Sequence, residues 1–113
     1  MRKYGRPWVK SMAYKIVYTA FAERDIWEIA DHLSEHSLQA AERFLRIGKG
    51  KIEGLADMPL IYPKIETHHE YRKMVLGNYV VLYEVNEQTE TVVILRVVHG
   101  KRNYQDNMID EES

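Results

Sequence analysis

The sequence of 113 residues contains no cysteine. This absence excludes a disulfide framework, a thiolate metal site and a cysteine nucleophile, and it favours a reducing, cytoplasmic location. No segment approaches the roughly 20 consecutive apolar residues of a membrane-spanning helix. Residues 1–11 are basic but lack the apolar run of a signal peptide. We therefore expect a cytoplasmic protein with no membrane partner.

The chain also lacks a strong net charge, because its 16 Lys and Arg residues and 17 Asp and Glu residues give a formal charge of -1. A protein that holds nucleic acid by electrostatics alone is strongly basic, so any such contact here must be local. The charge that exists lies at the two ends of the chain. We expect a basic extension over residues 1–12, one domain over residues 13–105 and an acidic tail over residues 106–113.

Several catalytic motifs are absent: a Gly-rich phosphate loop, a G-x-S-x-G elbow and a pair of catalytic carboxylates. The segment from His32 to His36 matches the H-x-x-E-H pattern of one group of zinc peptidases, but no third ligand stands out on a later helix. His68 and His69 are adjacent and are expected to be surface residues of a loop. We expect no metal and no cofactor.

The most regular part of the sequence is Tyr71–Tyr104, which contains three apolar runs of strand length. These runs are Tyr71–Leu76, Tyr79–Val85 and Thr91–Val98. Gly77-Asn78 tolerates positive φ and predicts a tight hairpin turn, and Asn86–Glu90 has the length of an ordinary hairpin loop. The three runs are therefore predicted to form an antiparallel meander.

Upstream of this meander, the pattern predicts one strand and two helices. Ala13–Tyr18 is β-branched and alternating enough to form a strand, and Thr19 can cap a helix over about Ala20–Glu35. Ser37 can cap a second helix, in which Gly48 and Gly50 indicate close helix packing or a bend. A long loop then covers residues 56–70. The expected fold is α+β, in the order β-α-α-β-β-β, with a helical hairpin on one face of a small antiparallel sheet.

Both faces of the predicted meander are mostly apolar. Residues at alternate positions of a strand point to opposite faces, and neither set in Tyr79–Val85 or Thr91–Val98 is polar throughout. A sheet with one face in water shows polar residues at every second position. We therefore expect the chain's own helices to cover one face and a partner to cover the other.

Basic and aromatic residues follow the last strand abruptly. His99, Arg102 and Tyr104 could supply a proton acceptor, a phosphate clamp and a hydroxyl, which is equipment for cleaving RNA through its own 2′-hydroxyl. A basic rim that binds a protein or nucleic acid is equally compatible. Arg96 lies on an apolar face, so it must pair with a carboxylate such as Glu84, emerge at an edge or serve a ligand.

The order of elements, the R…GNY-VVLY pattern of Arg72–Tyr83 and the closing VILRVVHGKRNY resemble the RelE/ParE superfamily of bacterial toxins. The resemblance covers residues 13–105. It implies the toxin of a type II toxin-antitoxin, or plasmid stabilisation, module that assembles with a cognate antitoxin into a hetero-oligomer. RelE-like members cleave messenger RNA on the ribosome, whereas ParE-like members inhibit DNA gyrase.

Within this resemblance the ParE-like function is favoured. The chain departs from the RelE pattern because it lacks a lysine cluster before the second strand and has a nearly neutral core, and its long helical hairpin and the HGKR segment after the last strand look more like ParE. A metal-independent endoribonuclease acting on ribosome and messenger RNA is the alternative, and an inactive module that only binds antitoxin is the third hypothesis. The candidate catalytic residues, if the chain is a ribonuclease, are Arg72, His99, Arg102 and Tyr104. The candidate target-binding residues are Lys73, Arg96, Lys101 and Arg102.

Overall fold

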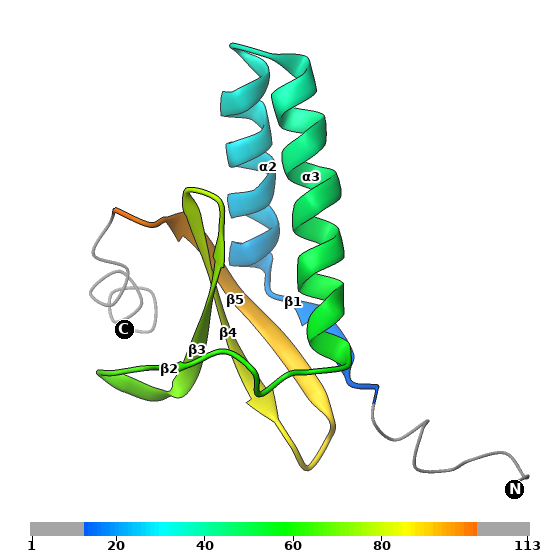
Figure 1. The fold of residues 1–113 in the computed structure, drawn as a ribbon, viewed down its shortest axis with the longest axis vertical. Helices are drawn as coiled ribbons and strands as arrows, with labels where there is room; N and C mark the ends of the chain where they lie inside the picture. Colours follow the sequence, from blue (N-terminus) through cyan, green and yellow to red (C-terminus); the bar gives the residue numbers. More distant parts are fainter. Residues whose placement is uncertain (1–12, 102–113) are drawn as a thin grey trace, which may run out of the picture.

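The computed structural model describes residues 13–101 and places two helices on one face of a five-stranded sheet (Figure 1). The helices are α2 (Ala20–Ser34) and α3 (Leu38–Glu53), and a short 3-10 helix η1 (Gly54–Ala56) follows. The strands are β1 (Lys15–Tyr18), β2 (Lys64–Ile65), β3 (His68–Leu76), β4 (Tyr79–Asn86) and β5 (Thr91–His99). The predicted α+β architecture is confirmed.

The sheet has the strand order β1-β5-β4-β3-β2, and it is mixed rather than purely antiparallel. The predicted meander of β3, β4 and β5 is confirmed, with Leu76 opposite Tyr79 across the first turn. Gly77 has φ +61°, and a positive φ at the first central residue is what a type II′ hairpin turn requires. The sheet is mixed because β1 pairs in parallel with β5.

Each helix begins at the predicted cap. The Thr19 hydroxyl accepts a hydrogen bond from the Ala22 amide at 3.0 Å, and the Ser37 hydroxyl accepts one from the Ala40 amide at 3.1 Å. These bonds satisfy amides that have no partner within the helix. The main core lies between the helices and the sheet, where Ala22, Met74 and Ile94 are each fully buried.

The opposite face of the sheet differs from the prediction. Leu82 and Val98 are 0% and 2% exposed, and they form a second apolar cluster with Ile65, Tyr71 and Val80. The expectation that a partner must cover this face is therefore wrong for its centre. Val75 of β3, opposite Val80 of this cluster, is nevertheless 60% exposed. The other exposed large apolar side chains lie mainly on the helices and the loop after α3: Phe21, Trp27, Leu38, Ile47, Met58, Leu60, Ile61 and, on β1, Val17.

Gly48 and Gly50 of α3 have different surroundings. Gly48 is buried, and a Cβ at this position would lie 3.3 Å from Leu76 Cδ2, so the close packing is against the sheet. Gly50 is exposed, and a Cβ there would meet nothing within 4 Å. Packing thus accounts for Gly48 but not for Gly50.

Gly50→Ala should therefore raise the free energy of unfolding by about 1 kcal/mol, the difference in helix propensity between the two residues. Urea denaturation followed by far-UV circular dichroism measures this change. Gly48→Ala is the matched control, and its gain should be smaller because its methyl group crowds Leu76. A larger gain at Gly48 than at Gly50 would contradict this packing of α3 on the sheet.

Candidate functional site

Arg96 of β5 is a buried structural residue. Its Nε donates to Asp25 Oδ2 at 2.7 Å and its Nη2 donates to Asp25 Oδ1 at 3.1 Å, and the two side chains are 9% and 8% exposed. The predicted carboxylate partner was Glu84, but the carboxylate that binds the guanidinium is Asp25 of α2. Because this pair is buried, the Arg96 side chain does not lie at the surface where a target would bind.

The Asp25 carboxylate also accepts a backbone hydrogen bond from β5 beyond the end of β1. The register of β1 on β5 ends at Tyr18 opposite Ile94, and beyond this point the Val97 amide donates to Asp25 Oδ2 at 2.9 Å. The Thr19 hydroxyl likewise donates to the Leu95 carbonyl at 2.9 Å. Because backbone groups at an uncovered edge need partners, these bonds fix α2 against β5.

Arg72 anchors the long loop before the sheet. Its Nη1 donates to the Tyr62 carbonyl at 2.6 Å, the Lys73 amide donates to the Pro63 carbonyl at 3.1 Å, and the Tyr83 hydroxyl donates to the Pro59 carbonyl at 3.0 Å. The loop from 57 to 63 is therefore tied to β3 and β4. Residues 64–70, which were assigned to the same loop, form β2 and the start of β3.

Burial raises the pKa of Tyr83 to about 12 from its ordinary value of 10.0, and nearby Arg72 opposes part of this rise. The folded protein holds the phenolic proton more tightly than the unfolded chain does. Stability from Tyr83 is therefore fully present below pH 10 and is lost as the pH rises from about 10 to about 12. Burial also raises the pKa of Tyr18, whose contribution falls with rising pH in the same way.

Tyr83→Phe should make the decline in unfolding free energy above pH 10 shallower, because the ionisable phenol is gone. At neutral pH the same variant should be about 1–3 kcal/mol less stable, because the buried Pro59 carbonyl loses its donor. Urea denaturation at a series of pH values measures both effects. Parallel stability curves for the variant and the wild type above pH 10 would contradict this assignment.

The structure separates two of the four candidate catalytic residues. Arg72 lies opposite Tyr83 on β4, whereas His99 lies opposite Tyr79. The four-residue separation along β4 corresponds to about 13 Å, and β4 lies between the strands that carry the two residues. Arg72 therefore lies in the middle of β3, whereas His99 lies at the end of β5. Arg102 and Tyr104 lie outside the described residues.

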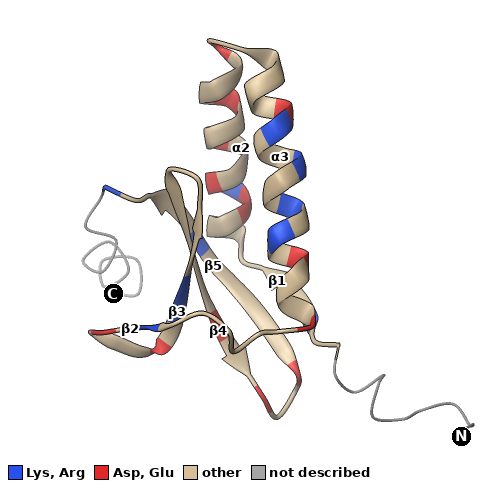
Figure 2. Cartoon of the chain, in the orientation of Figure 1, with Lys and Arg blue, Asp and Glu red and all other residues tan. Residues whose placement is uncertain are grey.

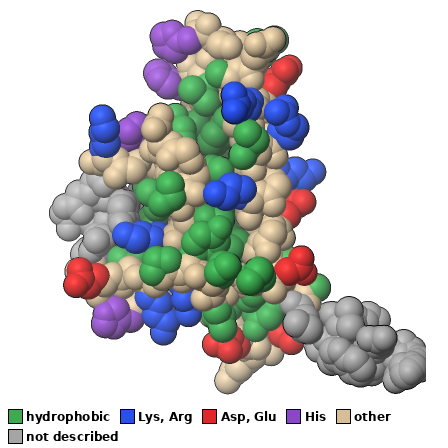
Figure 3. All heavy atoms as spheres, in the orientation of Figure 1, with side chains coloured by type: hydrophobic (Ala, Val, Ile, Leu, Met, Phe, Trp, Pro, Cys, Tyr) green, Lys and Arg blue, Asp and Glu red, His purple; other side chains and the backbone are tan. Residues whose placement is uncertain are grey.

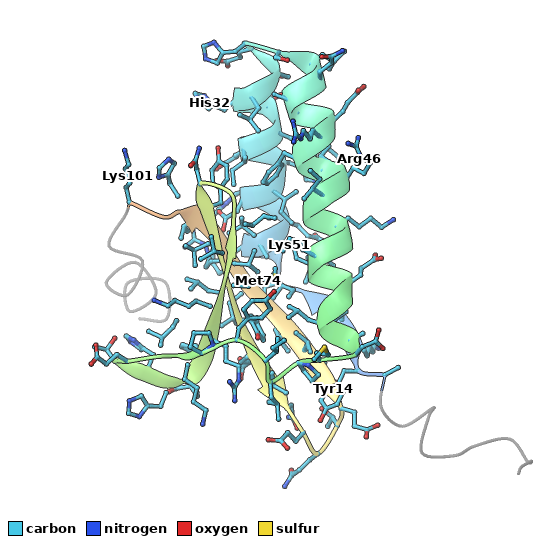
Figure 4. All side chains as sticks on the ribbon, viewed as in Figure 1. Tyr14, His32, Arg46, Lys51, Met74 and Lys101 are labelled. Atoms are coloured by element: carbon cyan, nitrogen blue, oxygen red, sulfur yellow. The ribbon has the colours of Figure 1, made fainter. Side chains whose placement is uncertain are left out.

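The end of the sheet that carries His99 is exposed at the hairpin tip, Gly77-Asn78, and at Gly100 and Lys101. Lys101, which is labelled in Figure 4, is exposed. Its backbone amide donates to His99 Nδ1 at 3.2 Å. Lys73 is half-buried in the middle of β3 and is not part of this end. Among the candidate target-binding residues that lie within residues 13–101, Lys101 is thus the one that is exposed and lies outside the strands.

A chain of aromatic contacts connects this end of the sheet to α3. The ring centroids of Phe44 and Tyr79 are 5.4 Å apart, and those of Tyr79 and His99 are 5.5 Å apart. Both pairs meet edge to face, an arrangement that aromatic rings favour. Any molecule that covers Phe44 and Tyr79 will therefore lie beside His99.

A hollow of about 580 Å³ lies between α3 and the tip of the β3–β4 hairpin, and we call it the α3 groove. The end of α2, the turn after it and α3 contribute Leu33, Ser37, Gln39, Ala40, Arg43, Phe44 and Ile47, and the hairpin contributes Leu76, Gly77, Asn78 and Tyr79. Hydrophobic side chains run along the junction of α3 and the sheet, with basic side chains beside them (Figure 3). A second hollow of about 330 Å³ between α2 and α3 shares Phe44 and Leu76 with the groove.

The two helices carry net charges of opposite sign, α2 being mainly acidic and α3 mainly basic (Figure 2). Arg43, Arg46 and Lys49 are exposed on α3, and within residues 13–101 they form no ion pair closer than 4.0 Å. Arg46 points away from the helical hairpin into solvent (Figure 4). Lys51 instead donates to the Val75 carbonyl at 3.2 Å, at the edge of β3. Of these cationic residues, Arg43 lines the α3 groove and Lys49 lines the second hollow. The α3 groove thus has an apolar floor with the Arg43 guanidinium at its side.

The histidines of the H-x-x-E-H segment do lie near each other, with ring centroids of His32 and His36 5.6 Å apart. Within the described part of the chain, no three His, Asp or Glu residues gather in a way that could hold a metal ion. None of the described helices is long and apolar enough to cross a bilayer.

Comparison with known proteins identifies a protein family whose model matches this chain. The family model described as "ParE toxin of type II toxin-antitoxin system, parDE" matches residues 16–104. No curated protein sequence matches the chain. Among solved structures, the chain is similar to a chromosomal ParDE toxin-antitoxin system from P. aeruginosa, with a TM-score of 0.68, 15% identity and coverage of 78% of this chain and 97% of that one.

Two RelE structures are also similar. The isolated E. coli RelE toxin matches with a TM-score of 0.56 and 16% identity, covering 89% of this chain and 100% of that one. The RelBE2 toxin-antitoxin complex from Mycobacterium tuberculosis matches with a TM-score of 0.54 and 25% identity, covering 77% and 98%. The match of the family model over residues 16–104, on the same fold, shows that this chain belongs to the ParE toxin family of type II toxin-antitoxin systems, within the RelE/ParE superfamily.

Proposed function

We propose that this chain is a ParE-like toxin that inhibits DNA gyrase and that a cognate antitoxin neutralises it by filling the α3 groove. The observation that carries the proposal is the groove itself: an apolar hollow of about 580 Å³, beside free cationic side chains, that reaches the exposed end of the sheet through Tyr79. Apolar grooves of this kind receive amphipathic segments of a partner protein.

The chemistry of the groove specifies the antitoxin segment. Phe44, Ile47 and Leu76 require apolar side chains, and Arg43 favours a carboxylate next to them. The similar structures from P. aeruginosa and Mycobacterium tuberculosis are named as toxin-antitoxin systems or complexes, which supports the same kind of partner here. A toxin-antitoxin hetero-oligomer is the expected assembly.

Three observations favour gyrase over the ribosome as the target. The matching family model is that of ParE toxins, the chain has a net charge of -1, and Arg72 is bound to loop carbonyls far from His99. Binding to ribosomal RNA depends on many phosphate contacts, which a neutral protein supplies poorly. The proposal therefore gives the protein no catalytic step of its own.

The exposed end of the sheet supports one alternative function. Of the candidate catalytic residues, His99 lies there, and Arg102 and Tyr104 follow in the sequence, so a RelE-like, metal-independent ribonuclease could use these three residues. In that case Arg102→Ala should reduce cleavage by orders of magnitude without loss of the fold. Unchanged cleavage by this variant would remove Arg102 from the site.

Two parallel assays decide between the targets. Purified gyrase should lose supercoiling activity when the protein is added and regain it when the product of the adjacent reading frame is added as well. Primer extension on messenger RNA from induced cells should show no cleavage within codons. Cleavage with gyrase unaffected would overturn the proposal in favour of the ribonuclease, and inactivity in both assays would favour a module that only binds antitoxin.

A further inference from the structure

The chain contains its own candidate occupant for the α3 groove. Residues 106–113, DNMIDEES, place the apolar pair Met108-Ile109 between Asp106 and the acidic run Asp110, Glu111 and Glu112. This is the pattern that an apolar floor with a cationic side selects, because the apolar pair can leave water while the carboxylates stay near guanidinium groups. The tail and α3 are thus complementary in both hydrophobicity and charge.

The described part of the chain ends beside the groove. The Gly100 amide donates to the Asn78 carbonyl at 2.8 Å, and Asn78 itself lines the groove at the hairpin tip. From Gly100 to Met108 an extended chain can span up to about 26 Å. The groove side of α3, from Ser37 to Ile47, measures about 15 Å along the helix axis. The tail can therefore reach any part of the groove within its own molecule.

We propose that residues 106–113 dock intramolecularly in the α3 groove, with Met108 and Ile109 on Phe44, Ile47 and Leu76 and with the carboxylates beside Arg43. The tail then covers the apolar hollow whenever the chain is alone. One consequence rests on the proposed function: an antitoxin segment must displace the tail, so the tail weakens antitoxin binding. The docking itself depends on neither an antitoxin nor a target.

Paramagnetic relaxation in the full-length protein tests the docking directly. Because the sequence has no cysteine, Ser113→Cys provides a single site for a nitroxide label. The methyl signals of Ile47 and Leu76 should broaden strongly, and those of Val17 and Val92, which belong to the register of β1 on β5, should not. Reduction of the nitroxide provides the reference spectrum.

Other outcomes overturn the proposal. Broadening of Val80 and Val98 would place the tail on the opposite face of the sheet, and absence of specific broadening would show that it does not dock. A mixture of spin-labelled protein without isotopes and isotope-labelled protein without nitroxide tests for docking between two copies. Broadening of the methyl signals in this mixture would also contradict the intramolecular form.

Two variants make the test specific. In the spin-labelled protein, Met108→Asp should abolish the broadening of the groove methyl groups, because a carboxylate would have to enter the apolar floor. Leu38→Glu should leave it intact, because Leu38 is exposed on α3 but does not line the groove. Broadening that survives Met108→Asp would show that the apolar pair does not hold the tail. This experiment uses neither gyrase nor antitoxin, so its result is independent of the proposed function.

Discussion

Asp25→Asn is expected to lower the free energy of unfolding by about 3–5 kcal/mol, the cost of removing one partner of a buried ion pair. The change keeps the shape of the side chain but removes the negative charge that lies 2.7 Å from the almost fully buried Arg96 guanidinium. It also weakens the acceptor of the Val97 amide. Urea denaturation at neutral pH measures the loss.

Glu28→Gln is the matched control for this variant. Glu28 is an exposed carboxylate on the same helix, so its neutralisation should change stability by less than about 0.5 kcal/mol. A double variant, Asp25→Leu with Arg96→Met, should recover much of the loss, because it removes both charges together. Recovery should be incomplete, since the Val97 amide then has no carboxylate acceptor. Equal effects of Asp25→Asn and Glu28→Gln would contradict the structural role of the pair.

Ile47→Glu is expected to weaken antitoxin binding by about a hundredfold, which corresponds to about 2.7 kcal/mol. Ile47 lines the α3 groove and its side chain is 40% exposed outside the core of the domain, so the fold of the toxin should tolerate a glutamate there. In the complex the same carboxylate would lose its hydration and would lie in place of an apolar contact worth about 1.5–3 kcal/mol. Isothermal titration of each toxin variant with purified antitoxin measures the change.

Leu38→Glu provides the comparison for the groove variant. It makes the same kind of substitution on the same helix, but Leu38 is 67% exposed and does not line the groove. Its affinity for antitoxin should stay within about threefold of the wild type, which is about 0.6 kcal/mol. Equal losses at both positions would show that the antitoxin does not distinguish the groove from the rest of α3.

Local signals predicted most of the secondary structure. Thr19 and Ser37 cap helices because their hydroxyls accept from the amides of residues close in sequence. Gly77-Asn78 predicts its turn for a similarly local reason. The parallel pairing of β1 with β5 was not predicted, because strands far apart in sequence leave no local signal of their register. The early start of β3 was missed because His68, His69 and Glu70 are polar.

The candidate site was predicted less completely than the fold. Arg96 was recognised as a costly charge on an apolar face, but its partner was sought on the neighbouring strand. The available signal was Asp25, a carboxylate on the apolar stripe of α2 between Ala22 and Ile29. Two opposite charges on two apolar faces predict a buried pair.

The groove could not be read from the sequence. Its residues come from the end of α2, from α3 and from the hairpin tip, and each taken alone looks like ordinary core or turn sequence. Gly48 gave the nearest indication, because a small residue in a helix indicates close approach of another element. Sequence alone did not identify that element as Leu76 of β3.

Colony formation after induction tests the central claim, that an antitoxin controls this toxin through the α3 groove. We expect the wild-type chain to abolish colonies when induced alone and the adjacent reading frame to restore them. The Ile47→Glu chain should remain toxic but should no longer be rescued at the same antitoxin level, whereas the Leu38→Glu chain should be rescued like the wild type. Survival of cells that express the wild-type chain alone, or full rescue of the Ile47→Glu chain, would contradict the account.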